Sequence, residues 1–141
     1  MKIILYPFSL IYYIIISLHQ LCYKLKIFST IKFNAQIISI GNIEAGGTGK
    51  TPMTIYLSTI LTQKNISHVV VSRGYKKQSS GTLIVSDGKN ILVRSVKESG
   101  DEPLLLAHKL PSIPIVVGNN KIKAINVAIQ TFQPKIILLD E

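Results

Sequence analysis

The chain has 141 residues, 47% of them hydrophobic, and a formal net charge of +9 from 16 Lys and Arg against 7 Asp and Glu. This length allows one hydrophobic core. The positive charge favours anionic partners such as nucleotide phosphates and lipid headgroups, and no arginine-rich run or aromatic-interleaved basic strand indicates nucleic acid. A single cysteine, Cys22, excludes an internal disulfide framework, and the three scattered histidines give no metal-ligand cluster.

The N-terminal segment from Ile3 to Tyr23 carries no charged residue. As a helix it would be roughly 30 Å long, about the thickness of the hydrocarbon core of a bilayer, so it predicts a membrane helix. Lys24, Lys26 and Lys32 follow it and predict that this end stays cytoplasmic. A cleaved signal peptide fits poorly because no small-residue cleavage site follows, whereas a helix lying in the membrane interface is an open alternative. We therefore expect a membrane anchor and basic linker in residues 1–35, followed by a folded domain in residues 36–141.

A glycine-rich loop follows the apolar run Ile37–Ile40 and reads Gly46-Gly47-Thr48-Gly49-Lys50-Thr51-Pro52. A strand that breaks into such a loop and then opens a helix is typical of phosphate binding, because backbone N–H groups and the helix dipole point at the anion. Lys50 would contact the β- and γ-phosphates of ATP, and the Thr51 hydroxyl would be a Mg²⁺ ligand. The general pattern has glycine where this chain has Glu44, so an accidental glycine-rich hairpin is the alternative. The predicted nucleotide-binding residues are Glu44, Ala45, Gly46, Gly47, Thr48, Gly49, Lys50 and Thr51.

Helices and strands alternate along the rest of the chain. Apolar residues recur at helical spacing after the loop, at Met53, Tyr56, Leu57, Ile60 and Leu61, and predict a helix face that packs on a sheet. Strands are expected at His68–Ser72, Thr82–Ser86, Ile91–Arg94, Ile113–Val117 and Lys135–Asp140, with helices at Pro103–Lys109 and Lys121–Phe132. Asp87-Gly88-Lys89-Asn90 predicts a hairpin between the second and third of these strands. The pattern predicts an α/β fold of the P-loop NTPase type, with a mostly parallel sheet flanked by helices.

Three further polar residues fall at predicted strand ends or loops, where ligands gather in parallel sheets. Arg73 could contact a phosphate or an acidic substrate, or be an ordinary surface arginine. Asp101 could accept a proton from an attacking hydroxyl, or cap a helix. Asp140 follows four apolar residues and could orient Mg²⁺, or simply end a strand.

Four motifs together resemble the tetraacyldisaccharide 4′-kinase family, the lipid A 4′-kinases of Gram-negative bacteria. They are Ile40-Gly41-Asn42 with the glycine-rich loop, Ser72-Arg73-Gly74-Tyr75, Gly100-Asp101-Glu102-Pro103-Leu104-Leu105-Leu106-Ala107, and Val117-Gly118. Their order and spacing match the family, and an apolar N-terminal helix is also a family feature. The resemblance covers nearly the whole chain but only about the N-terminal half of a family member. It implies that residues 36–141 are the N-terminal part of a truncated P-loop kinase domain, which would lie at the cytoplasmic face of a bacterial inner membrane.

This resemblance implies Mg²⁺-dependent transfer of the ATP γ-phosphate to the 4′-hydroxyl of a lipid-linked tetraacyldisaccharide 1-phosphate. It implies that Lys50 neutralises phosphate charge, Thr51 helps to hold Mg²⁺, and Asp101 assists the attacking hydroxyl, with Arg73 nearby. Asp140 would begin the second acidic motif of the family. The chain departs from the family at three positions, with Glu141 in place of a second aspartate, Lys121 in place of arginine, and Glu44 in place of a small hydroxyl residue.

Two other functions are compatible with the loop. A membrane-associated switch ATPase of the partitioning type is one, although Ala45 stands where that class has a signature lysine. A non-catalytic remnant that binds nucleotide weakly or not at all is the other.

Overall fold

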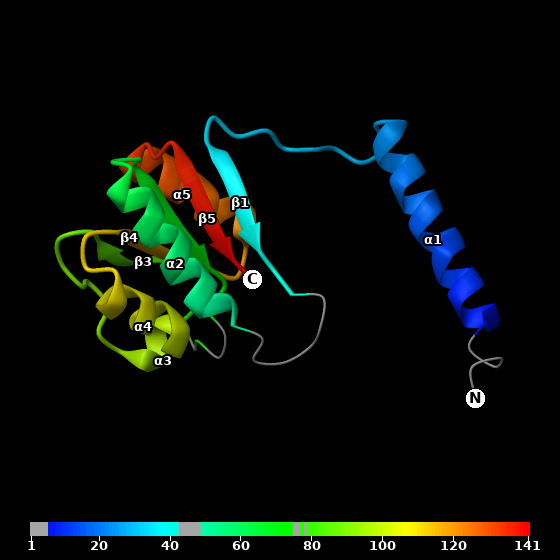
Figure 1. Cartoon of the computed structure of the whole chain (residues 1–141). Helices are drawn as coiled ribbons and strands as arrows, with labels where there is room; N and C mark the ends of the chain where they lie inside the picture. The colour runs from blue at the N-terminus through cyan, green and yellow to red at the C-terminus, as the bar shows by residue number, and fades with distance from the viewer. Residues whose placement is uncertain (1–5, 43–48, 75–76, 78) are drawn as a thin grey trace. The chain divides into compact units, whose positions relative to one another are not determined.

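The computed structural model describes residues 6–42, 49–74, 77 and 79–141. The chain divides into two compact units, Met1–Phe33 and Asn34–Glu141. Figure 1 shows the elements of both units.

In the first unit, a single helix, α1, runs over Tyr6–Lys24 and has no buried residue. Lys26 adopts a left-handed conformation (φ 57°) just after the helix, which folds the chain back. Phe28 then contacts the rings of His19 and Tyr23, with ring centroids 5.5 and 5.3 Å away. The predicted helix is therefore present. Among the described residues, however, no helix combines the length and the apolar character needed to cross a membrane, so the predicted spanning segment is not supported.

The second unit is a five-stranded sheet with helices on both faces. Its elements are β1 (Gln36–Ile40), α2 (Lys50–Gln63), β2 (His68–Ser72), β3 (Thr82–Asp87), α3 (Val96–Ser99), α4 (Asp101–Lys109), β4 (Pro114–Gly118), α5 (Lys121–Phe132) and β5 (Ile136–Asp140). The strand order is β1-β5-β2-β4-β3. All neighbouring strands are parallel except β3, which runs antiparallel to β4. This confirms the predicted α/β fold with a mostly parallel sheet.

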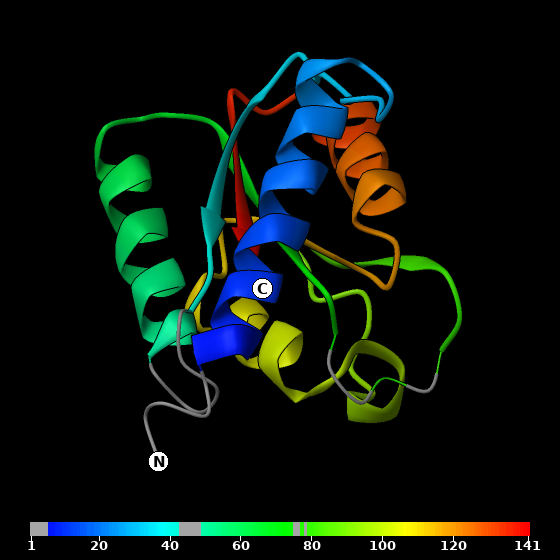
Figure 2. The same ribbon diagram turned by 90° about the vertical axis from the view of Figure 1, so that its right-hand side faces the viewer.

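The core lies on both sides of the central strands. Helices α2 and α4 cover one face and α5 covers the other, as the two views in Figures 1 and 2 show. Every residue of β2 is buried, which suits its run of β-branched valines in the middle of a parallel sheet. The largest fully buried side chains of the core include Leu106, Ile115, Ile137 and Leu138.

The face that α2 turns to the sheet differs from the predicted one. Met53 and Tyr56 were expected to pack inward but are 48% and 61% exposed. The buried positions are Thr54, Ser58 and Leu61, which also recur at helical spacing. Two of them are small hydroxyl residues, and each finds a hydrogen-bond partner on a strand. Polar side chains can be buried in this way when they are hydrogen-bonded, so the apolar pattern identified the helix but not its orientation.

The predicted hairpin is only partly present. Its turn forms as expected, with the Asp87 carboxylate accepting hydrogen bonds from the backbone N–H groups of Lys89 and Asn90 at 2.7 and 2.6 Å. Beyond the turn a single bridge joins Ser86 to Ile91, and residues 92–94 do not continue as a strand. The prediction of a strand at Ile91–Arg94 is therefore wrong. The true partner of β3 is β4, which follows it only after two helices.

Candidate functional site

The carboxyl ends of the parallel strands meet at one edge of the sheet. Asp140 of β5 lies beside Ile40 of β1 on one side and beside Ser72 of β2 on the other. Ser72 in turn lies beside Val117 of β4. In the sequence, the glycine-rich loop follows β1 and Arg73 follows β2, while Gly118 is the last residue of β4. The sheet register thus brings together motifs that are far apart in the sequence.

Helix α2 begins at this edge directly after the described end of the loop. Gly49 takes a left-handed conformation (φ 87°) and precedes Lys50, the first residue of the helix, with Thr51 next. The backbone N–H groups and the dipole at such a helix start favour an anion. Residues Glu44, Ala45, Gly46, Gly47 and Thr48, which were also predicted to bind nucleotide, lie outside the described residues.

Asp140 is the buried acid of the site. It is 5% exposed, and its Oδ1 accepts a hydrogen bond from the Thr54 hydroxyl at 3.3 Å. Its Oδ2 is buried and has no hydrogen-bond partner within the described part of the chain. Burial raises the pKa of Asp140, and the charge of Glu102 raises it further, while the Thr54 hydrogen bond and Lys50 act in the opposite direction. Lys50 and Glu102 thus both act on this carboxylate.

An unsatisfied carboxylate oxygen beside a helix start is suited to a hard cation. No group of three or more His, Cys, Asp or Glu side chains gathers in the described ranges, so a metal held entirely by such side chains is not indicated there. Mg²⁺ commonly takes one or two protein oxygens and completes its shell with water and substrate phosphates. The unpartnered Oδ2 of Asp140 has the chemistry of one such oxygen, and Thr51 is the second residue of the neighbouring helix α2.

Gly74 places the segment after β2 against the start of α4. It has φ 70°, and a Cβ there would collide with Cγ2 of Val117 and approach the carbonyl oxygen of Ser99 to 3.0 Å. Only glycine allows this approach without displacement. Arg73 precedes it and is exposed, and the Gly100–Asp101 turn follows Ser99 directly.

Asp101 is the first residue of α4 and is exposed. The N-cap position belongs to Gly100, which lacks a side chain, so Asp101 is not the capping residue of this helix. Asp101 and Glu102 instead occupy the first turn, where negative charge is favourable.

The residue after Asp140 has different surroundings. Glu141 forms an ion pair with Lys121 of α5 at 2.6 Å, and its backbone N–H donates to the carbonyl of Ile40 at 3.2 Å. The hydrogen bond from Lys121 lowers the pKa of Glu141, with a smaller contribution from Ser39. The side chains of the two adjacent acids therefore contact different helices: Asp140 contacts α2 and Glu141 contacts α5.

Sequence reasoning missed Thr54, Glu102 and the Lys121–Glu141 pair. A signal existed for Thr54, which lies one helical turn after Lys50 on the same face as Ser58. Nothing in the sequence indicated that this face would meet β5, because that depends on the strand order.

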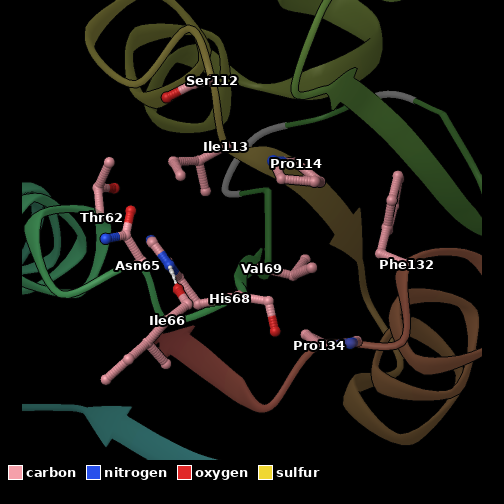
Figure 3. A pocket seen from close by; sticks show the side chains of 11 residues that line it. Thr62, Asn65, Ile66, His68, Val69, Ser112, Ile113, Pro114, Phe132 and Pro134 are labelled. Atoms are coloured by element: carbon pink, nitrogen blue, oxygen red, sulfur yellow. Dashed lines mark hydrogen bonds between the residues drawn. The ribbon is translucent and has the colours of Figure 1, made fainter.

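The structure also contains a cavity of about 430 Å³ at the opposite edge of the sheet (Figure 3). It is lined by residues at the amino ends of β2 and β4 and at the carboxyl ends of α2 and α5, among them His68, Pro114, Thr62 and Phe132. None of the predicted site residues lines it. The candidate site is therefore the carboxyl edge of the sheet and not this cavity.

Comparison with known proteins gives a consistent result. The profile of the family described as LpxK, tetraacyldisaccharide-1-P 4′-kinase, matches residues 1–141. A tetraacyldisaccharide 4′-kinase of Halothermothrix orenii is 44% identical over 145 residues, and one of Desulfatibacillum aliphaticivorans is 40% identical over 137 residues. They cover 99% and 94% of this chain, which spans 37% and 36% of their length.

A solved structure is also similar. It is the crystal structure of LpxK from Aquifex aeolicus in complex with ATP, which superposes with a TM-score of 0.79 at 38% sequence identity. The match covers 97% of this chain and 42% of that one. The family profile spans the full length of the sequence, and the fold agrees with that of a solved member. The chain therefore belongs to the tetraacyldisaccharide 4′-kinase family.

Proposed function

We propose that this chain forms the nucleotide site of a kinase that transfers the γ-phosphate of ATP to the 4′-hydroxyl of a tetraacyldisaccharide 1-phosphate in lipid A biosynthesis. Membership of the family and the ATP bound to the Aquifex relative support the proposal. The observation that carries it is the buried Asp140 carboxylate at the sheet edge, within electrostatic reach of Lys50. Because the chain spans about two fifths of its relatives, the activity is proposed for the protein encoded by the complete reading frame that contains it.

In this proposal each residue has a role set by its position. The amides at the start of α2 bind phosphate oxygens, and the Lys50 ammonium neutralises charge on the transferred group. Asp101, exposed at the start of α4, accepts the proton of the acceptor hydroxyl, and Arg73 binds phosphate from the end of β2. Thr51 and Asp140 would hold Mg²⁺, which neutralises developing charge in phosphoryl transfer.

We also propose that α1 lies on the lipid surface at the cytoplasmic face of the bacterial inner membrane. Its side chains include many exposed large apolar residues, among them Phe8, Leu10, Ile11 and Ile15. Lys24, Lys26 and Lys32 follow and would attract anionic headgroups. Such a helix would keep the kinase near an acceptor whose acyl chains stay in the bilayer.

The experiment that tests the proposed activity is replacement of Lys50 by alanine in the protein made from the complete reading frame. Transfer of radiolabelled γ-phosphate from ATP to tetraacyldisaccharide 1-phosphate should fall by about 100-fold or more, as for loss of other groups that stabilise transition-state charge. Lys64→Ala is the matched control, because Lys64 is exposed just beyond the other end of the same helix. Wild-type transfer by the Lys50→Ala protein would show that the loop has been assigned wrongly.

A further inference from the structure

Thr54 is a fully buried hydroxyl residue that the proposed mechanism does not use. It lies on the sheet-facing side of α2, and its exposed fraction is 0%. Its Oγ1 lies 3.1 Å from the carbonyl oxygen of Lys50 and 3.3 Å from Oδ1 of Asp140. The second contact joins residues 86 positions apart in the sequence, on α2 and β5.

The hydroxyl has one proton and two acceptors in reach, so the two contacts compete. The Lys50 carbonyl is in the first turn of an α-helix, where the backbone N–H four residues later is its regular donor. Loss of the hydrogen bond would cost more at Asp140 than at the Lys50 carbonyl. The Asp140 carboxylate is buried, and its other oxygen has no hydrogen-bond partner among the described residues. Hydrogen bonds to ionised acceptors are also stronger than those to neutral ones. The Thr54 proton is therefore assigned to Oδ1 of Asp140.

From this geometry we propose that Thr54 is a positioning residue, whose hydroxyl holds Oδ1 of Asp140 and so keeps Oδ2 available for a divalent cation bound with the phosphates of a nucleotide. The inference rests on the proposed function, because that function brings the cation to Asp140. Without the hydroxyl, Oδ1 loses this hydrogen-bond donor. The carboxylate can then rotate toward any other positive group at the sheet edge. Outer partners that orient a metal-binding carboxylate commonly change metal affinity by 10–100-fold.

The test measures the affinity for ATP with Mg²⁺ and with EDTA, in the protein from the complete reading frame. The variants are Thr54→Val, which keeps the shape but removes the donor, Thr54→Ala, which removes both, and Thr54→Ser, which keeps the donor. Thr59→Val is the matched control. The Thr59 hydroxyl, like that of Thr54, lies beside the carbonyl oxygen four residues earlier on the same helix, but Thr59 is exposed. Circular dichroism and thermal melting check that each variant is folded.

We expect Mg²⁺ to tighten ATP binding in the wild type, in Thr54→Ser and in Thr59→Val. In Thr54→Val and Thr54→Ala this Mg²⁺-dependent gain should shrink about tenfold or more, while the affinity in EDTA stays within about twofold of the wild type. An unchanged gain in both donor-free variants would overturn the role of Thr54 and leave the proposed function standing. An equal loss of affinity in EDTA would also overturn it, because that pattern indicates a general structural role. Absence of ATP binding by the wild type would instead overturn the proposed function and the inference together.

Discussion

Gly74 determines how closely the segment after β2 approaches β4 and the end of α3. We predict that Gly74→Ala lowers the free energy of unfolding by about 2–5 kcal/mol, from the cost of a left-handed conformation plus overpacking against Val117. Denaturant unfolding followed by circular dichroism measures the change.

Gly81 provides the matched control for that experiment. It has a similar left-handed conformation (φ 88°), but nothing lies within 4 Å of the position a Cβ would take. Gly81→Ala should therefore cost only the backbone part, about 1–2 kcal/mol. Equal effects of the two substitutions would contradict the close approach at Gly74.

His68 is a buried histidine whose hydrogen bonds define one tautomer. Its Nδ1 lies 2.9 Å from the carbonyl oxygen of Ile66, to which it can only donate, so its neutral Nε2 accepts from the Ser58 hydroxyl at 2.7 Å. Burial lowers the pKa of His68, and the hydrogen bond with Ile66 opposes this effect only in part. The folded protein therefore favours the neutral form of this side chain more than the unfolded chain does.

The sign of the resulting pH dependence follows from that shift. Between the lowered pKa and the ordinary value of about 6.5, the unfolded chain binds more protons than the folded one. We predict that the contribution of His68 to the free energy of unfolding is fully present above about pH 6.5 and falls by up to about 1.4 kcal/mol per pH unit below it. Denaturant titrations at pH 7.5 and 5 measure this loss of stability. The loss should be smaller in His68→Gln than in the wild type. In His108→Gln, where an exposed histidine is replaced, it should equal the wild-type loss.

Among the elements, α5 and β5 are joined at their ends by the Lys121–Glu141 ion pair. The two side chains are 46% and 35% exposed, so water and salt weaken their attraction. Lys121 also lies in the first turn of α5, where the helix dipole disfavours positive charge. We predict that Glu141→Gln lowers the free energy of unfolding by less than about 1 kcal/mol and that 1 M salt removes most of the difference.

A double-mutant cycle with Lys121→Ala isolates the pair, and Lys123→Ala serves as the control, because Lys123 carries the same charge on the same turn. A coupling energy well above 1 kcal/mol would show that the pair behaves as a buried one.

Helix α1 yields a prediction about lipid binding. Deletion of residues 1–35 from the complete protein should release it from vesicles that contain anionic phospholipids, since the apolar helix and the three following lysines are removed together. Cosedimentation with the vesicles measures binding, and added salt should weaken the binding of the undeleted protein in part. A folded deletion protein that sediments as before would exclude α1 as the attachment.

The bounds of some elements could be predicted from local patterns alone. The expected ranges His68–Ser72 and Lys121–Phe132 match β2 and α5, because a valine run and a helical apolar period are strong local signals. Helix α4 begins at Asp101, two residues earlier than expected, because proline is tolerated in a first helical turn. Strands β3 and β4 were both predicted, but their pairing was not, since the choice of partner is not encoded near the turn.

For the whole molecule, the sequence predicted the fold class and the meeting of the polar strand ends at the carboxyl edge of the sheet. The glycine-rich loop and Asp140 carry patterns that point to phosphate and Mg²⁺ chemistry wherever they occur in such a fold. Thr54 and Glu102 carry no such pattern, and they act on Asp140 only because α2 and α4 pack on the same face of a sheet in which β5 lies between β1 and β2. The contribution of such residues depends on the tertiary structure and not on the spacing of their neighbours.

The position of β1 has a consequence for the dynamics of this protein. In the described part of the sheet β1 pairs only with β5, whereas β2 pairs with both β5 and β4. Amide protons of β1 should therefore exchange with solvent faster than those of β2, because fewer neighbours must separate to expose them. A nucleotide that bridges the loop after β1 and the end of β5 would couple the opening of the outer strand to that of the inner one. Ligand binding would then slow exchange along all of β1, including residues that the ligand never contacts.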